Sequence, residues 1–158
     1  MLRILDNPLQ DIPMAAVLAS PIVGMDDEEL AQIRSAFKGV SFAQAALSAM
    51  AGENGYEDEK LKAFALVFER LRGAVADTPI HELLYMMLDE TGFYRYGSAM
   101  PAGKRRRQNI DMLIEMAAAY EKTSYKGLFH FVRYIDIQQK YEIDYGEADT
   151  AGENDDVV

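Results

Sequence analysis

Apolar residues recur at every third or fourth position through most of this 158-residue chain, and this spacing limits the folds that the chain can adopt. The clearest run consists of Leu61, Phe64, Phe68, Leu71 and Val75. In an α-helix these five side chains share one face, which can pack against a core. No segment before residue 146 alternates apolar and polar residues as a half-buried strand does. The sequence therefore predicts an all-α fold, a compact multi-helix bundle.

Proline, glycine and helix-capping residues divide this pattern into about six or seven helices. The Ser-Phe-Ala-Gln run that begins at Ser41 has the form of a capping box, and Asp26 or Asp27 can cap the preceding helix. Thr78 followed by Pro79 predicts an N-cap and a first helical residue. We expect helices to begin near residues 11, 26, 41, 58, 79, 104 and 125, the last two reaching about residues 123 and 141, with residues 93–100 as a short connection.

The composition excludes several kinds of site and location. The chain has no cysteine and only two histidines, which argues against a disulfide framework, a thiolate-bound metal and a histidine-rich metal centre. No apolar run reaches the length of a membrane span, so no membrane partner is expected. The first residues lack the basic and then apolar layout of a secretory signal. These features predict a cytoplasmic protein.

Charge is distributed unevenly along the chain. The net charge is −10, but residues 1–93 carry −8, residues 94–140 carry +5 and residues 141–158 carry −7. Four consecutive cations in the basic part stand at the predicted start of a helix, where positive charge opposes the helix dipole, and others follow one stripe of the last helix. The alternative is an ordinary solvated or salt-bridged surface. The candidate DNA-binding residues are Lys104, Arg105, Arg106, Arg107, Lys126, Arg133 and Lys140.

The sequence shows no complete catalytic or cofactor site. A G-x-x-x-x-G-K-[ST] phosphate loop is absent, so the chain is not expected to bind ATP by that route. Asp58-Glu59-Lys60 matches the D-x-K core of many Mg-dependent nucleases, but no second acidic cluster accompanies it and it opens an amphipathic helix. His81 and His130 are interpreted as structural or surface residues. We therefore expect no catalytic, cofactor-binding or metal-binding residue in this chain.

Several short segments, taken in order, resemble a known family. They are D-N-P-L-Q-D-I-P at residues 6–13, L-A-S-P-I-V-G at 18–24, E-T-G-F at 90–93, T-S-Y-K-G-L-F at 123–129 and G-E-N-D-D-V-V at 152–158. The set resembles the UvrD/RecB-like superfamily 1 helicases, and within them the AddA subunits of the bacterial AddAB helicase–nucleases. The resemblance covers essentially the whole chain. It implies that residues 1–145 form an inserted 2B subdomain, followed at 146–158 by a mobile acidic tail that leads to an absent strand.

The resemblance further implies a parent enzyme that uses ATP and Mg to unwind DNA in the 3′ to 5′ direction and cuts it with a separate nuclease domain, in double-strand break repair and recombination. This subdomain would be an accessory piece, inactive alone, that lies beside duplex DNA. It would contact other domains of the parent helicase, whose partner is the AddB subunit. A free-standing helical protein-interaction module is the alternative function, and a small enzyme is a third.

One loop departs from the family pattern. In UvrD-like relatives the loop that matches residues 21–25 carries an Arg and touches the DNA backbone. In this chain Val23 stands at that position, and the acidic residues Asp27, Glu28 and Glu29 follow and would repel phosphate. The departure argues against DNA contact by this loop.

Overall fold

The computed structural model describes residues 1–123 and 127–140, without the side chain of residue 140. These residues form nine α-helices and one 3₁₀ turn, with no strand among them, so the predicted all-α class is confirmed. No helix within these ranges is both long and apolar enough to cross a membrane. The predicted tail at 146–158 lies outside the described residues. The elements are α1 (Leu2–Asp6), α2 (Asp11–Ala19), α3 (Asp27–Ala36), α4 (Phe42–Met50), η1 (Glu53–Gly55), α5 (Glu59–Ala74), α6 (Ile80–Thr91), α7 (Phe93–Ala99), α8 (Gly103–Tyr120) and α9 (Leu128–Lys140).

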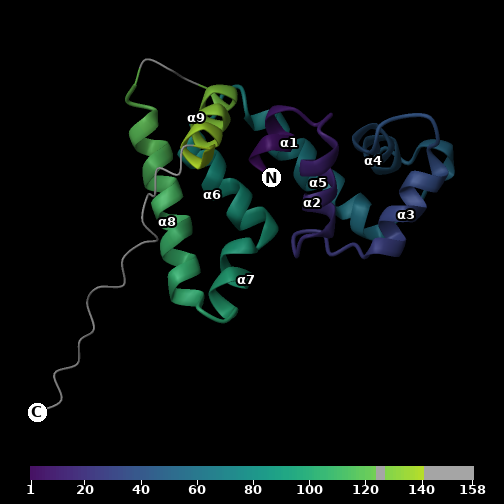
Figure 1. The fold of residues 1–158 in the computed structure, drawn as a ribbon, viewed down its shortest axis with the longest axis horizontal. Coiled ribbons are helices and arrows are strands. Elements are labelled where there is room, and N and C mark those ends of the chain that lie inside the picture. The colour runs from purple at the N-terminus through teal and green to yellow at the C-terminus, as the bar shows by residue number, and fades with distance from the viewer. Residues whose placement is uncertain (124–126, 141–158) are drawn as a thin grey trace, which may run out of the picture.

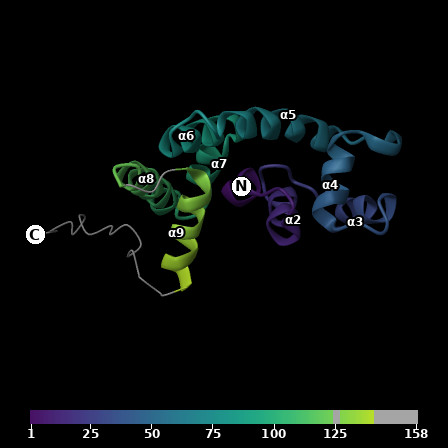
Figure 2. The same cartoon turned by 90° about the horizontal axis from the view of Figure 1, so that it is seen from above.

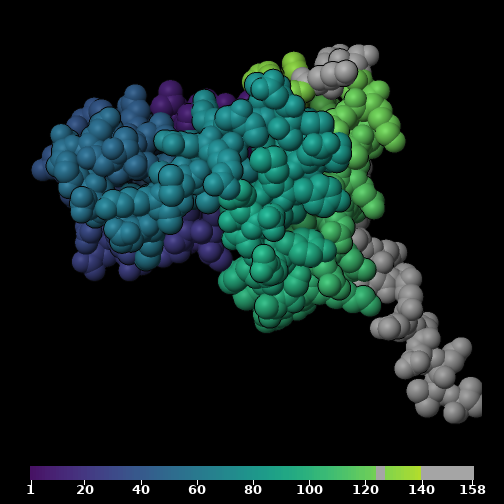
Figure 3. Space-filling model, turned by 180° about the vertical axis from the view of Figure 1, so that it is seen from behind, coloured from purple at the N-terminus to yellow at the C-terminus, as the bar shows by residue number. Residues whose placement is uncertain are grey.

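The helices form two lobes that lie side by side (Figures 1 and 2). The N-terminal lobe contains α1–α5, and the C-terminal lobe contains α6–α9, with α5 leading directly into α6. Each lobe has its own apolar core, built around Met14 and Phe68 in the first and around Ile114 and Phe131 in the second. The surfaces of the lobes join without a break when the molecule is seen from behind (Figure 3). Three buried residues of the C-terminal lobe belong to the first core and so tie the lobes together: Leu83, Leu128 and Val132.

Helix α1 lies between the lobes and is held from both sides. Its Arg3 Nη2 is 2.6 Å from Oδ1 of Asp136 on α9, and Arg72 Nη1 on α5 donates to the backbone oxygen of Leu5 at 3.0 Å. Arg72 thereby satisfies a carbonyl at the end of α1 that has no partner within the helix. The sequence pattern did not predict α1, because a five-residue helix is too short to show helical periodicity.

Side-chain caps fix the starts of three helices. The capping box of Asp26 and Glu29 opens α3, and the predicted capping box at Ser41 opens α4, where the Gln44 N–H donates to the Ser41 hydroxyl at 3.2 Å. Asp58 caps α5, accepting a hydrogen bond from the Leu61 N–H at 2.8 Å. The first residue of the D-x-K triplet at residues 58–60 is therefore a helix cap.

The structure differs from the sequence prediction at α7, at the end of α8 and at the start of α6. The segment expected as a connection contains a helix, α7, and α8 ends at Tyr120, three residues before the expected position. Thr78 does not cap α6: the N-cap position is Pro79, which has no side chain able to accept a hydrogen bond. The cap comes instead from Glu121, at the end of α8, whose carboxylate accepts from the N–H groups of Ile80 and His81. A carboxylate from a distant part of the chain thus takes the role expected of the local threonine.

Candidate nucleic-acid interface

The basic run of residues 104–107 occupies the first turn of α8, as the sequence predicted, and all four side chains are exposed. Its position depends on a close contact between α7 and α8. A Cβ atom on Gly103 would lie 2.0 Å from the carbonyl oxygen of Ser98, so only glycine allows the two helices to approach this closely. The preceding residue, Ala102, has φ 58° and turns the chain sharply into α8. The resulting α7–α8 hairpin presents the cations at one end of the C-terminal lobe (Figure 1).

The described contacts leave the charges at the end of this run uncompensated. Arg106 donates from Nε to the carbonyl oxygen of Pro101 at 3.2 Å, which braces the hairpin turn but involves no counter-charge. Among the residues that the structure describes, neither Arg106 nor Arg107 takes part in an ion pair. No side chain caps the start of α8, and its first turn contains no acidic residue. The first turn of α8 is therefore a site where an added anion would be stabilised.

The structure does not bring Arg133 together with this run. Arg133 lies on α9, with its guanidinium carbon 5.7 Å from the centre of the Phe129 ring. Helix α9 meets α8 at the opposite end of α8, where the Tyr120 ring centre is 5.4 Å from that of Phe131. Because Tyr120 stands 13 residues after Arg107 on α8, about 20 Å of helix separates the basic run from this contact. Lys126 and the side chain of Lys140 lie outside the described residues.

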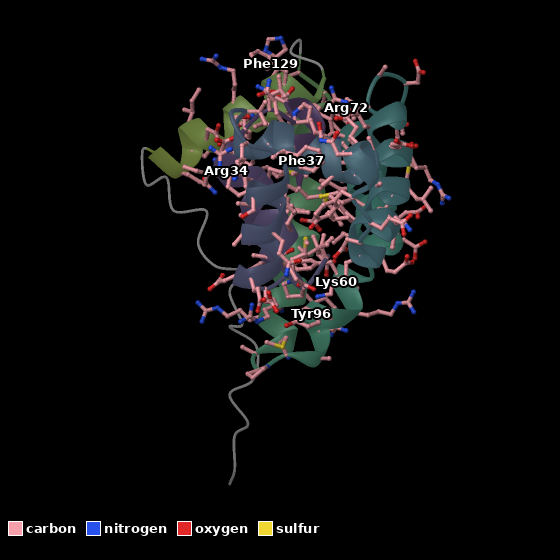
Figure 4. All side chains as sticks on the ribbon, turned by 90° about the vertical axis from the view of Figure 1, so that its right-hand side faces the viewer. Arg34, Phe37, Lys60, Arg72, Tyr96 and Phe129 are labelled. Carbon is pink, nitrogen blue, oxygen red and sulfur yellow. The ribbon has the colours of Figure 1, made fainter. Side chains whose placement is uncertain are left out.

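Exposed apolar side chains border the basic run on the hairpin. Tyr96 on α7 and Met100 in the turn are both exposed, and Figure 4 shows Tyr96 at the end of the molecule where the hairpin lies. The Tyr96 ring stacks on Phe93, with 6.3 Å between the ring centres. The sequence did not indicate the exposed Tyr96 and Met100, because residues 93–100 were expected only as a short connection.

The loop at residues 21–25 in the N-terminal lobe has a different electrostatic character. Lys60 Nζ donates to the carbonyl oxygen of Gly24 at 2.9 Å and to both carboxylate oxygens of Glu29 at 2.7 Å (Figure 4). The hydrogen bond between them is the main cause of a raised pKa for Lys60 and a lowered pKa for Glu29, so each holds the other in its charged form. The cation nearest this loop is therefore already neutralised, and Asp26 and Asp27 beside it are exposed.

The remaining sequence candidates have structural partners. His81 Nδ1 lies 2.6 Å from Glu121 Oε2, and Lys60 pairs with Glu29 rather than facing a metal site. His130 is exposed, with its ring centre 5.3 Å from that of Phe129. In the described ranges, no group of three or more His, Cys, Asp or Glu side chains is arranged to hold a metal ion.

Comparison with known proteins identifies what the chain is similar to. No family model matches it. It is 42% identical to the AddA subunit of an ATP-dependent helicase/nuclease from Anoxybacillus flavithermus, in an alignment of 160 residues that covers 100% of this chain and 13% of that protein. Proteins with the same description from Bacillus cytotoxicus and Bacillus velezensis are 42% and 38% identical, over 99% and 100% of the chain. The chain spans about 13% of the length of these relatives. Over its whole length it therefore belongs to the AddA family of ATP-dependent helicase/nuclease subunits, as the counterpart of one segment of those proteins.

Proposed function

We propose that residues 1–145 act as a non-catalytic, 2B-like subdomain of a DNA helicase/nuclease in double-strand break repair and recombination, and that the first turn of α8 contacts duplex DNA. The observation that carries this proposal is the run of four exposed cations, Lys104 to Arg107, at the start of a helix. Three of the four are arginines, whose planar guanidinium groups suit phosphate oxygens.

The position of these cations on the helix favours the binding of an anion. The N-terminal end of a helix carries partial positive charge, so cations in the first turn cost stability instead of contributing to it. A bound phosphate reverses the sign of that effect, because it is attracted both by the cationic side chains and by the positive end of the helix dipole. Contacts of this kind position a protein on DNA without reading its sequence. We therefore infer weak, salt-sensitive and sequence-independent binding.

The charge of the other lobe supports one orientation on DNA. Residues 1–93, which include the whole N-terminal lobe, carry −8, whereas residues 94–140 carry +5. A molecule with this asymmetry meets a polyanion with its basic end first. The α7–α8 hairpin would then face the duplex, and the acidic loop at residues 21–25 would lie away from it.

The catalytic functions of the family are proposed to lie elsewhere in the longer protein. The relatives are described as ATP-dependent helicase/nuclease subunits, and the aligned segment is 13% of their length. This chain contains no phosphate-loop sequence. We infer that ATP and Mg act in other domains of the parent, with which this subdomain packs, and that an AddB subunit is the partner of the parent.

One observation favours the alternative of a protein-interaction module. Ile12 on α2 and Leu66 on α5 are large apolar residues that are 84% and 69% exposed. Scattered apolar residues are normal on protein surfaces, but these two are candidates for contacts with another protein.

A salt titration separates the two functions. A fluorescein-labelled duplex is titrated with the 158-residue chain by fluorescence anisotropy at several salt concentrations. We expect a dissociation constant on the order of 10⁻⁴ M or weaker near physiological salt, and an affinity that rises steeply as the salt is lowered. No binding at the lowest salt, or binding that is insensitive to salt, would contradict the DNA function and leave the interaction module.

A further inference from the structure

A small hollow lies between α6, α7 and α8 in the C-terminal lobe, and no sequence motif indicates it. It is lined by Tyr85, Leu88, Asp89, Tyr94, Arg95, Asp111 and Ile114 and has a volume of about 230 Å³. This volume is below the ~300–1,000 Å³ of sites for drug-sized ligands, so the hollow suits a single planar group better than a large ligand.

The lining combines an apolar floor with aromatic walls. Leu88 and Ile114 are buried and form the floor, whereas Tyr85 is 57% exposed. The Tyr94 hydroxyl donates to Oδ1 of Asp111 at 3.2 Å, which fixes the second ring from the α8 side. Burial, this hydrogen bond and the nearby Tyr85 contribute to a raised pKa of Tyr94, as expected where two tyrosines share one space. A flat apolar ligand can stack on such walls.

Positively and negatively charged side chains surround the buried Leu88 and Ile114. Asp89 and Arg95 are 4.0 Å apart, and both side chains are more than four-fifths exposed, so this pair is weak and its groups can exchange partners with a ligand. Asp111 can accept further hydrogen bonds besides the one from the Tyr94 hydroxyl, because an ionised carboxylate accepts several. Carboxylates recognise ligands that carry amino groups.

The hollow adjoins the basic run of α8. Arg107, its last cation, stands one helical turn before Asp111 on the same helix and is close enough to act on the pKa of Tyr94. An anionic group bound at Arg107 would therefore hold an attached planar group near the tyrosines.

We propose that this hollow binds an unpaired nucleobase of a DNA strand whose backbone lies on the first turn of α8. The inference rests on the proposed function and extends it to unpaired DNA. Tyr85 stacks on the base, Arg107 contacts the adjoining phosphate, and Asp89 accepts hydrogen bonds from exocyclic amino groups. Because cytosine, adenine and guanine carry such an amino group and thymine does not, the hollow disfavours thymine.

The test compares strands that share phosphates but differ in bases. The 158-residue chain is titrated with two labelled single strands of equal length, an oligo-dC strand and a strand of abasic residues, at low salt. We expect tighter binding of the oligo-dC strand by roughly fivefold or more, the usual effect of one stacked base. In Tyr85→Ala this preference should disappear, while the affinity for the abasic strand stays unchanged. Leu66→Ala, which removes an exposed apolar side chain from the other lobe, is the control and should keep the preference.

Each result bears on the proposal. Equal affinity of the unchanged chain for the two strands, or a preference that survives in Tyr85→Ala, overturns it. Thermal melting of each variant shows whether the fold is retained, and because Tyr85 is largely exposed its replacement should change stability little. Failure of the proposed function looks different: neither strand would then bind in a salt-dependent way.

Discussion

His81 and Glu121 form a contact between the start of α6 and the end of α8, with Nδ1 of His81 2.6 Å from Oε2 of Glu121. The other oxygen of Glu121 accepts hydrogen bonds from the backbone N–H groups of Ile80 and His81. The contact spans 40 residues of sequence. A single carboxylate therefore both caps α6 and joins its start to the end of α8.

Removing this carboxylate should destabilise the protein. Glu121→Ala leaves two N–H groups of α6 without their acceptor, and we expect the free energy of unfolding in urea to fall by about 1 kcal/mol, the typical cost of losing an N-cap. Glu115→Ala removes an exposed carboxylate from the middle of α8 and should change it by less than about 0.5 kcal/mol. Equal effects of the two substitutions would show that Glu121 does not stabilise α6.

Two substitutions on α5 test which face of this helix is buried in the core of the N-terminal lobe. Phe68 on α5 is 4% exposed and its ring lies 5.8 Å from that of Phe64. Phe68→Ala should lower the free energy of unfolding by roughly 3–5 kcal/mol, because it removes a buried ring and leaves a cavity. Leu66→Ala, on the exposed face of the same helix, should cost no more than about 0.5 kcal/mol. Similar decreases in the two variants would contradict the orientation of α5.

A carboxylate that caps another helix should make stability depend on pH. Asp11 on α2 accepts a hydrogen bond from the Ala43 N–H at 2.9 Å, and this bond is the main cause of a pKa below the ordinary 3.8. Because the folded pKa is lower than the unfolded one, the stabilisation is complete above the unfolded pKa and is lost as the pH falls through the folded pKa.

Asp11→Asn should therefore weaken the loss of stability on acidification below about pH 5. The difference in unfolding free energy between the unchanged chain and the variant should be largest near neutral pH and shrink towards pH 3. Urea unfolding across this range measures it, with Glu115→Gln as a control for the loss of one negative charge. Parallel pH profiles for the unchanged chain and Asp11→Asn would rule out the contribution of Asp11.

Local sequence signals predicted most of the helices. Helices α3 and α4 begin at capping boxes, whose two hydrogen bonds join residues three positions apart, so the whole interaction is visible in a short sequence window. The apolar face of α5 was predicted for the same reason: the spacing of Leu61, Phe64, Phe68 and Leu71 records the burial of one side of a helix, and all four are buried.

Contacts between distant residues were not predictable in this way. Thr78-Pro79 has the local form of a helix start, but the acceptor for α6 is Glu121, and nothing in either segment marks the other. The hollow depends on Tyr94 meeting Asp111 across the α7–α8 turn, a pairing that helical spacing does not encode. The sequence prediction grouped Arg133 of α9 with the cations of α8 because they share the same charge. In the structure α9 meets α8 at Tyr120, so Arg133 lies far from the first turn of α8.

The 158-residue chain should lack the catalytic activities of the family. We expect the purified chain to show no DNA-stimulated ATP hydrolysis and no cutting of linear duplex DNA in the presence of Mg, because its sequence has no phosphate loop and the described residues contain no metal-binding cluster. A mock preparation carried through the same purification sets the background. Turnover above that background, stimulated by DNA, would contradict the non-catalytic role.

Contact between the first turn of α8 and duplex DNA can be tested by comparing two variants of equal charge. The dissociation constant for a labelled duplex is measured against salt concentration for the unchanged chain, for Arg105, Arg106 and Arg107 changed together to Ala, and for Lys38, Lys62 and Arg70 of the N-terminal lobe changed together to Ala. Both variants have the same net charge. We predict that only the α8 variant binds more weakly, with a salt slope that is reduced by up to about 0.9 for each phosphate that the variant no longer neutralises. Unchanged affinity and slope in the α8 variant, or equal weakening in both variants, would show that this run is ordinary surface.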